Sequence, residues 1–147
     1  MKGETMWRKE RLAAPTTWTT DRTRPRVLIE HHDWAISNAI SNLLRDAGFD
    51  TSTCDGPDGS RRCPFVHSGT CPRAEEADLV IFGFEISDED DRAVLASLKA
   101  HASGRPIIVE VTSTRAALYK DELEGCVLVA RPMRRATHLD AIDRVMP

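Results

Sequence analysis

The sequence has no long apolar run, no excess of basic residues and no glycine-rich phosphate loop, and each absence argues against a class of protein. No apolar stretch approaches the roughly 18 residues that a membrane-spanning helix needs. The N-terminal region is polar and lacks the apolar core of a secretory signal, so we expect a cytoplasmic protein. The net charge is −3, whereas a domain that binds nucleic acid through charge needs a basic surface. We therefore expect no membrane contact and no direct nucleic-acid binding.

The sequence also lacks the residue groupings that mark most enzymes. It contains no nucleophile–base constellation and no loop of glycines that could cradle a phosphate, so we expect a non-enzymatic protein. Its 147 residues fit one domain and a tail. Residues 1–24 show no sustained hydrophobic period and are predicted to form a flexible tail, with Trp7 and Trp18 either folded loosely over the body or part of a docking peptide. The domain is predicted to span residues 25–147.

From residue 26 onward, short apolar runs alternate with amphipathic segments. The runs predict five strands, at residues 26–30, 49–54, 77–84, 105–113 and 125–131. The amphipathic segments predict four helices, at residues 33–48, 87–104, 114–123 and 133–146. In the first helix we expect Asp33 to cap the N-terminus and Gly48 to end the last turn. Its buried stripe is predicted to contain Ile36, Ile40, Leu43, Leu44 and Ala47.

Five strands separated by long crossovers predict an α/β fold with a doubly wound parallel sheet between two helical layers. The expected arrangement is flavodoxin-like, with strand order 2-1-3-4-5. The polar strand at residues 49–54 suits a sheet edge. In such folds the working crevice lies at the carboxyl ends of the strands, so the residues that follow the strands should decide the function.

Three segments of the chain resemble the receiver domain of two-component response regulators. They are "RVLIEHHDWAISNAISNLLRDAGF", "ADLVIFGFE" and "PIIVEVTS…CVLVARPM", within residues 26–146. The resemblance implies phosphoryl transfer to an aspartate with the help of Mg²⁺ held by an acidic pair. It also implies a lysine and a Ser/Thr hydroxyl that read out the phosphate.

The residues that this chemistry requires are replaced in the chain. His31 and His32 stand where the resemblance places the acidic pair, and Gly83 stands where it places the phosphoacceptor. Mg²⁺ prefers hard oxygen ligands, which two imidazoles and a glycine do not supply. We therefore predict a degenerate receiver without aspartyl phosphorylation. Glu85, two positions past the lost aspartate, could supply a carboxylate, but it should lie beyond the strand end.

The readout positions are also altered. Arg131 replaces the lysine and keeps the charge but not the compact ammonium group. The switch hydroxyl aligns with Val111, or with Thr112 if the alignment shifts by one residue.

The segment "CDGPDGSRRCPFVHSGTCP", residues 54–72, lies where the second helix of a receiver should be. Its prolines and glycines exclude a long helix, so residues 55–73 are predicted to form a loop, with one short helical turn after Pro72. The spacing of Cys54, Cys63, His67 and Cys71 offers a ligand set for zinc, and the Cys-Pro steps are similar to iron–sulfur ligands. His31 and His32 at the neighbouring strand tip could join Cys54 in such a site.

Two further roles for these cysteines stay open. The thiols could be reduced loop residues, or Cys63 and Cys71 could form a disulfide. Cys126 is predicted to be a buried core thiol inside the fifth strand, and His101 and His138 to be exposed helical residues.

Two functions are compatible with these observations. The first is a signalling module that acts on a protein partner, or as a homodimer, through the face that the resemblance assigns to output. That face would include Leu118, Tyr119, Arg131 and Met133. The second is a metal-binding or redox-sensing module that uses the Cys/His loop.

Overall fold

A computed structural model of the chain describes residues 18–19, 22–57, 63–101, 104–131 and 134–146. Its centre is a parallel sheet with strand order β2-β1-β3-β4-β5. The strands are β1 Arg26–Glu30, β2 Asp50–Cys54, β3 Leu79–Phe82, β4 Ile107–Val111 and β5 Val127–Ala130. The predicted five-stranded α/β fold and its strand order are confirmed, including the edge position of the polar strand β2.

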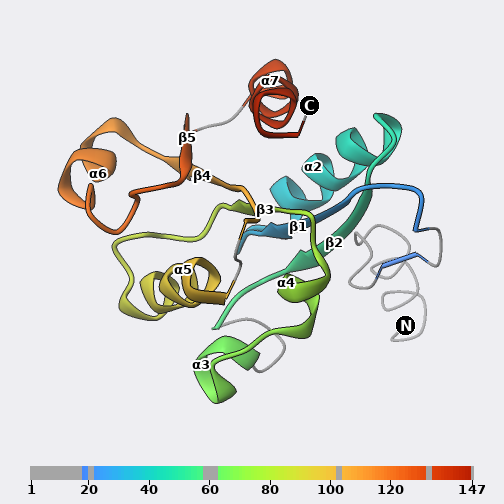
Figure 1. The fold of residues 1–147 in the computed structure, drawn as a ribbon. Helices are drawn as coiled ribbons and strands as arrows, with labels where there is room; N and C mark the ends of the chain where they lie inside the picture. Colours follow the sequence, from blue (N-terminus) through green and yellow to red (C-terminus); the bar gives the residue numbers. More distant parts are fainter. Residues whose placement is uncertain (1–17, 20–21, 58–62, 102–103, 132–133, 147) are drawn as a thin grey trace, which may run out of the picture.

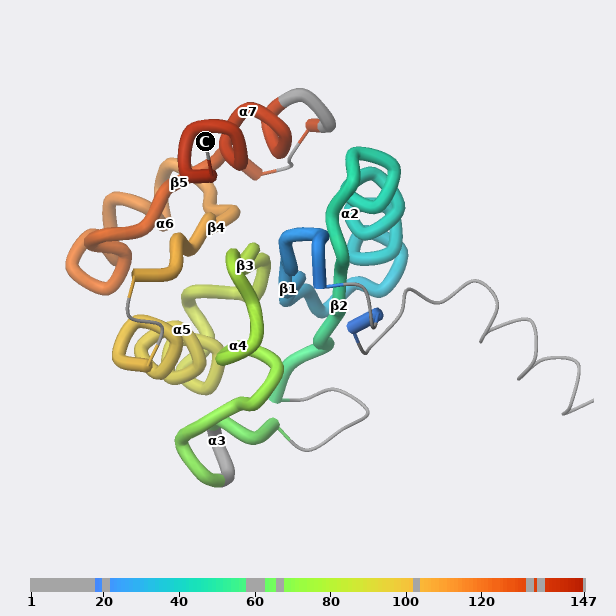
Figure 2. Tube along the Cα trace, turned by 45° about the vertical axis from the view of Figure 1, so that its right-hand side comes forward, coloured from blue at the N-terminus to red at the C-terminus, as the bar shows by residue number. Residues whose placement is uncertain are grey.

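Helices cover both faces of the sheet. They are α2 Trp34–Asp46, α3 Pro64–Ser68, α4 Pro72–Glu76, α5 Glu89–His101, α6 Ser113–Leu118 and α7 Arg135–Val145. Figures 1 and 2 show α2 and α7 on one face, α3, α4 and α5 on the other, and α6 beside the β5 end of the sheet. None of the described helices is both long enough and apolar enough to span a bilayer.

Two apolar clusters hold these layers together, one on each side of the sheet. On the α5 side, Phe82 and Val109 pack with Leu95 and Leu98 of the helix. On the α2–α7 side, the buried residues are Val27, Ile29, Ile40, Leu44, Leu79, Ile81, Ile108, Val129, Ala141 and Ile142. Successive residues of a strand point to opposite faces of the sheet. Because helices cover both faces, every side chain of β3 is buried, and the β3 sequence is apolar without polar alternation.

Helix α2 begins and ends where the sequence predicts, but its buried face differs. The Asp33 carboxylate accepts hydrogen bonds from the backbone N–H groups of Ala35 and Ile36, at 2.9 and 3.2 Å, and Gly48 has a φ of 99° just past the helix. Ile36, for which the sequence predicts burial, is 45% exposed. The buried stripe instead includes two serines, and Ser41 forms a 2.6 Å hydrogen bond with Thr51 of β2. Apolar periodicity alone does not detect a face that buries small polar residues.

The crossover between β2 and β3 contains two short helices where the sequence predicts one helical turn. Helix α4 is the turn expected after Pro72, and α3 is not predicted. Both helices begin at a Cys-Pro step, with Cys63 or Cys71 at the N-cap and proline at the first helical position. Proline suits that position because it has no N–H to leave unpaired. The two Cys-Pro steps therefore act as helix starts.

Two described residues of the tail, Trp18 and Thr19, contact the domain. The Thr19 hydroxyl donates a 3.0 Å hydrogen bond to the Asp50 carboxylate, and the Arg26 guanidinium lies 5.5 Å from the centre of the Trp18 ring. The rest of the predicted tail up to residue 17, together with residues 20 and 21, lies outside the described residues.

Candidate functional site

The predicted crevice lies at the carboxyl ends of the strands. The register pairs Glu30 with Cys54 and with Phe82, so β1, β2 and β3 end at the same level. His31 and His32 follow β1, and Gly83 follows β3. The five positions predicted from the resemblance therefore gather at this end of the sheet, but their side chains enter three separate groups of contacts.

The ring of His31 fills the space beside Gly83. A Cβ atom placed on Gly83 would lie 2.5 Å from Cδ2 of His31 and 3.1 Å from the carbonyl oxygen of Glu30. The first distance is well below van der Waals contact, and the second is a close approach to backbone that cannot easily move. A side chain at position 83 is thus incompatible with the observed position of His31.

The hydrogen bonds of His31 determine which of its ring nitrogens carries the proton. The backbone N–H of Asp33 donates to Nδ1 of His31 at 3.0 Å, so Nδ1 is the acceptor and the proton of the neutral ring is on Nε2. Nε2 lies 3.7 Å from Oε2 of Glu110. A metal ion bound at Nε2 would require a proton on Nδ1, which the Asp33 N–H excludes. This ring is therefore poorly suited to be a metal ligand.

Glu110 is the centre of a buried polar cluster on the α7 side of the sheet. Glu110 belongs to β4. Its Oε2 lies 3.8 Å from Nε of Arg131, and its Oε1 lies 3.5 Å from Nε2 of His138. The prediction that His138 is exposed is wrong, because only 3% of it is accessible. Burial lowers the pKa of His138 to about 4, although the Glu110 carboxylate acts in the opposite direction. Sequence reasoning missed this cluster; its signal was an acidic residue in the middle of the apolar run "IIVEV".

His32 points to the opposite face and connects three segments. Its Nδ1 donates to the carbonyl oxygen of Asp55 at 2.8 Å, and its Nε2 lies 2.7 Å from Oδ2 of Asp91 in α5. The ring stacks on Phe84 with a centroid distance of 4.6 Å. Because the backbone carbonyl of Asp55 can only accept, Nδ1 of His32 carries a proton, and Nε2 forms the second contact of the ring with the Asp91 carboxyl group.

A buried carboxyl group lies next to this pair. Glu30 is the last residue of β1, and burial, together with the charge of Asp91, raises its pKa to about 8, whereas Arg73 acts to lower it. Oε1 of Glu30 and Oδ1 of Asp91 are both buried without a hydrogen-bond partner. Glu30 is therefore expected to be largely protonated at pH 7.

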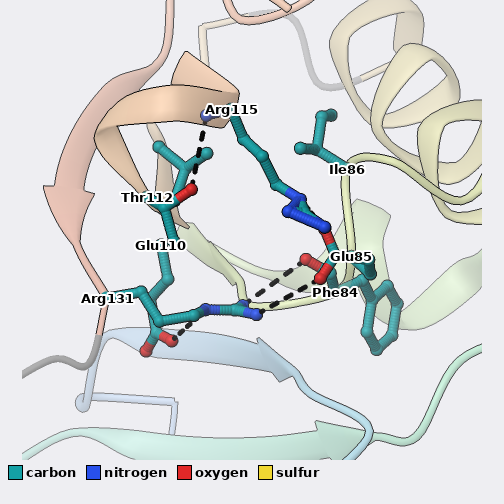
Figure 3. Close-up of a pocket in the computed structure, with 8 residues that line it drawn as sticks. Phe84, Glu85, Ile86, Glu110, Thr112, Arg115 and Arg131 are labelled. Atoms are coloured by element: carbon teal, nitrogen blue, oxygen red, sulfur yellow. Dashed lines mark hydrogen bonds and ion pairs between the residues drawn. The ribbon is translucent and has the colours of Figure 1, made fainter. Parts of the chain in front are cut away.

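Arg131 crosses the end of β3 and lines a small pocket with Glu85 and Arg115 (Figure 3). Its Nη2 donates to the carbonyl oxygen of Gly83 at 2.5 Å. Thr112, the N-cap of α6, also lines the pocket, and its hydroxyl accepts from the backbone N–H of Arg115. The guanidinium of Arg131 thus occupies the crevice beside the glycine.

The three cysteines of the crossover lie on the α5 side of the sheet. Cys63 and Cys71 are buried in the apolar cluster there, Cys54 packs against it, and all four cysteines of the chain are free thiols. Burial raises the pKa of Cys54 to about 12 and raises that of Cys71 as well, which disfavours the thiolate that a metal or an oxidant requires.

The metal prediction remains untested for the full ligand set. The side chain of His67 lies outside the described part, and within that part no three His, Cys, Asp or Glu side chains form a group that could hold a metal ion. The sequence predicts Cys126 to be buried inside the fifth strand. It precedes β5 and is partly exposed, so that prediction is wrong.

The predicted interaction face is only partly presented to solvent. Leu118 is 72% exposed. Tyr119 packs against the core, with the Arg92 guanidinium 5.2 Å from its ring centre. Arg131 turns inward, and Met133 lies outside the described residues.

Comparison with known proteins identifies the fold but not a closer relationship. No family model and no curated protein sequence matches the chain. Among solved structures, the chain is similar to the signal receiver domain of a response regulator from Bermanella marisrubri, with TM-score 0.63 and 20% identity over 84% of this chain and 99% of that one. It is also similar to the chemotaxis protein CheY4 of Vibrio cholerae, with TM-score 0.62 and 15% identity over 84% and 99%.

A third similar structure is the receiver domain of a histidine kinase from Syntrophus aciditrophicus, with TM-score 0.62, 17% identity, and coverage of 83% of this chain and 89% of that one. At these identities the likeness concerns the backbone alone. The chain therefore has the fold of response regulator receiver domains.

Proposed function

We propose that the chain is a receiver-like signalling module that acts by protein–protein contact and is not phosphorylated on aspartate. The observation that carries the proposal is the His31 ring against Gly83, which occupies the space that a phosphoacceptor side chain would need.

The charges around Gly83 support the same conclusion. The Arg131 guanidinium lies on the Gly83 carbonyl and 3.8 Å from Glu110, so the crevice already contains a permanent cation. A Mg²⁺ ion at this place would be repelled by that cation and would find imidazoles instead of carboxylates at positions 31 and 32. Glu85, the carboxylate two positions after Gly83, is paired with Arg115 in this structure, with Oε1 2.6 Å from Nε.

In this proposal the output passes through contact with a protein partner or with a second copy of the chain. The exposed Leu118 on α6 supports contact at this end of the sheet. A cytoplasmic location is part of the proposal, and the four free thiols are compatible with such a reducing compartment.

Incubation of the protein with acetyl phosphate and Mg²⁺ tests the proposal. We expect the intact mass to remain unchanged, while a phosphorylatable receiver domain treated in parallel gains a phosphoryl group. An acid-labile adduct on any aspartate of this chain would refute the proposal.

Metal analysis and visible absorbance of protein purified without oxygen distinguish the proposed function from the alternative, a zinc or iron–sulfur module. Because burial raises the pKa of Cys54 and Cys71, we expect less than stoichiometric metal and no colour. One equivalent of zinc, or absorbance in the visible, would favour the alternative.

A further inference from the structure

The pocket between the loop after β3 and helix α6 contains two arginines that share one carboxylate. Nε of Arg115 lies 2.6 Å from Oε1 of Glu85, and Nη1 of Arg131 lies 4.0 Å from its Oε2. Figure 3 shows the Arg115 guanidinium reaching toward Glu85 from above and the Arg131 guanidinium from the left. The two arginines at this end of the sheet therefore already bind one carboxylate group.

Arg115 keeps hydrogen-bonding capacity that Glu85 does not use. Its Nε is buried without a hydrogen-bond partner, whereas the equally unpartnered Nε of Arg131 faces Glu110 at 3.8 Å. The Arg115–Glu85 distance is short, but the oxygen lies off the direction of the Nε–H bond, so the contact is ionic without being a hydrogen bond. Buried donors without partners are uncommon in native proteins and call for an acceptor.

Displacement of Glu85 from the two arginines should cost little free energy. Its side chain is 38% exposed, and ion pairs of this exposure contribute about 0–1 kcal/mol. Its other contacts, from the hydroxyl of Ser87 at 3.0 Å and the N–H of Ser87 at 3.4 Å, lie within its own loop. Arg131 would remain in place, because it also bonds to the Gly83 carbonyl.

Glu85 indicates the kind of anion that the pocket accepts. With Glu85 in place the pocket has a volume of about 30 Å³, and the Glu85 carboxylate contacts both guanidiniums. A carboxylate of another molecule in its place would meet the same two arginines. Leu118 lies three residues after Arg115 on α6, so the two residues share a helix face, and Leu118 is strongly exposed.

We propose that this pocket binds a carboxylate side chain of a partner protein, which displaces Glu85 from Arg115 and Arg131 while a neighbouring apolar residue of the partner covers Leu118. This inference rests on the proposed function and specifies the chemistry of the partner: an acidic residue beside an apolar one. Glu85 is the internal occupant that keeps the site closed until such a segment arrives.

Acetate titrations of the full chain, followed by the ¹H–¹⁵N signals of residues 113–116 and the Arg115 side chain, test the pocket. At constant ionic strength, we expect acetate to bind Glu85→Ala at least fivefold more tightly than the unsubstituted chain. Binding to Glu85→Ala/Arg115→Gln should be at least tenfold weaker than to Glu85→Ala. Glu85→Gln serves as the second variant, because it removes the charge while keeping the side-chain size.

Two outcomes of these titrations would overturn the proposal. Equal acetate affinity in Glu85→Ala and in the double variant would show that Arg115 does not bind the anion. Inorganic phosphate that binds ten times more tightly than acetate would show that the site selects phosphate.

The partner chemistry is tested with two blocked dipeptides, acetyl-Glu-Leu-amide and acetyl-Gln-Leu-amide. We expect the Glu peptide to bind the unsubstituted chain at least fivefold more tightly, and Leu118→Ala to weaken that peptide about threefold without changing acetate binding. Equal affinity for the two peptides would refute carboxylate recognition. None of these results depends on phosphorylation: a phosphoryl adduct would refute the proposed function alone, and a failed titration would refute the pocket alone.

Discussion

His31 and His32 are adjacent in the sequence, but their rings lie on opposite faces of the sheet. His31 contacts Glu110 on the α7 side, and His32 contacts Asp91 on the α5 side. Each ring therefore connects the end of β1 to a different part of the core. The two histidines provide structural contacts at the positions where the receiver resemblance places the acidic pair.

Replacing His32 should show the size of this structural contribution. His32→Ala removes the contacts to Asp55 and Phe84 and leaves the buried Asp91 side chain without its partner on the His32 ring. We expect the free energy of unfolding to fall by about 2–4 kcal/mol in urea denaturation. His101→Ala, at an exposed helical histidine, is the matched control and should change it by less than about 0.5 kcal/mol. Equal effects of the two variants would contradict the structural role of His32.

Gly83→Ala tests the packing of the His31 ring against Gly83. The new Cβ would meet the His31 ring, so we expect a loss of about 1–3 kcal/mol in unfolding free energy. In a His31→Ala background the same substitution should cost less than half as much, since the obstructing ring is gone. If the cost is the same in both backgrounds, the ring is not what fills the space beside Gly83.

At the scale of elements, α6 differs from the longer helices because none of its residues is buried. Thr112 at its N-cap and the Arg115–Glu85 ion pair hold it beside the sheet. Local stability follows buried contacts, so α6 should open without unfolding of the core.

Thr112→Ala should loosen α6 selectively. Loss of the N-cap acceptor costs about 1 kcal/mol of helix stability, so the amides of residues 115–118 should exchange with solvent roughly fivefold faster. The unfolding free energy of the whole chain should change by less than about 0.5 kcal/mol, because α6 buries no residue. Asp33→Ala, at the N-cap of the well-packed α2, is the control and should lower the global value by about 1 kcal/mol. A global loss from Thr112→Ala as large as the control's would show that α6 belongs to the cooperative core.

The elements also show what the sequence could and could not predict. The strands and their order follow from local apolar runs and crossover length, so the gathering of His31, Gly83 and Arg131 at the strand ends was predictable. Their partners were not, because Glu110 and His138 meet only through the packing of α7 on the sheet. The same holds for the buried serines of α2, whose burial depends on Thr51 of β2.

For the molecule as a whole, two buried groups on opposite sides of the sheet make stability depend on pH in opposite directions. The pKa of Glu30 is raised from 4.5 to about 8, so the folded state holds a proton that the unfolded state releases, and stability falls as pH rises through this range. The pKa of His138 is lowered from 6.5 to about 4, so stability falls as pH decreases from 6.5 toward 4.

The two effects cancel between about pH 4.5 and 6.5, and only the Glu30 effect remains above that range. We expect these two groups to make the protein less stable at pH 8 than at pH 6.5 by about 2 kcal/mol in urea unfolding. Glu30→Gln, which mimics the protonated acid, should abolish this decrease. Parallel pH profiles for the variant and the unsubstituted chain would contradict the assignment.

The His31 ring beside Gly83 also has a consequence for timing. A covalent phosphoryl mark outlasts the encounter that produced it, and its hydrolysis rate sets how long a receiver remains active. Under the proposed function this chain keeps no such record. Its signal would begin when a partner binds and end when the partner dissociates, so the dissociation rate of the complex would act as the clock.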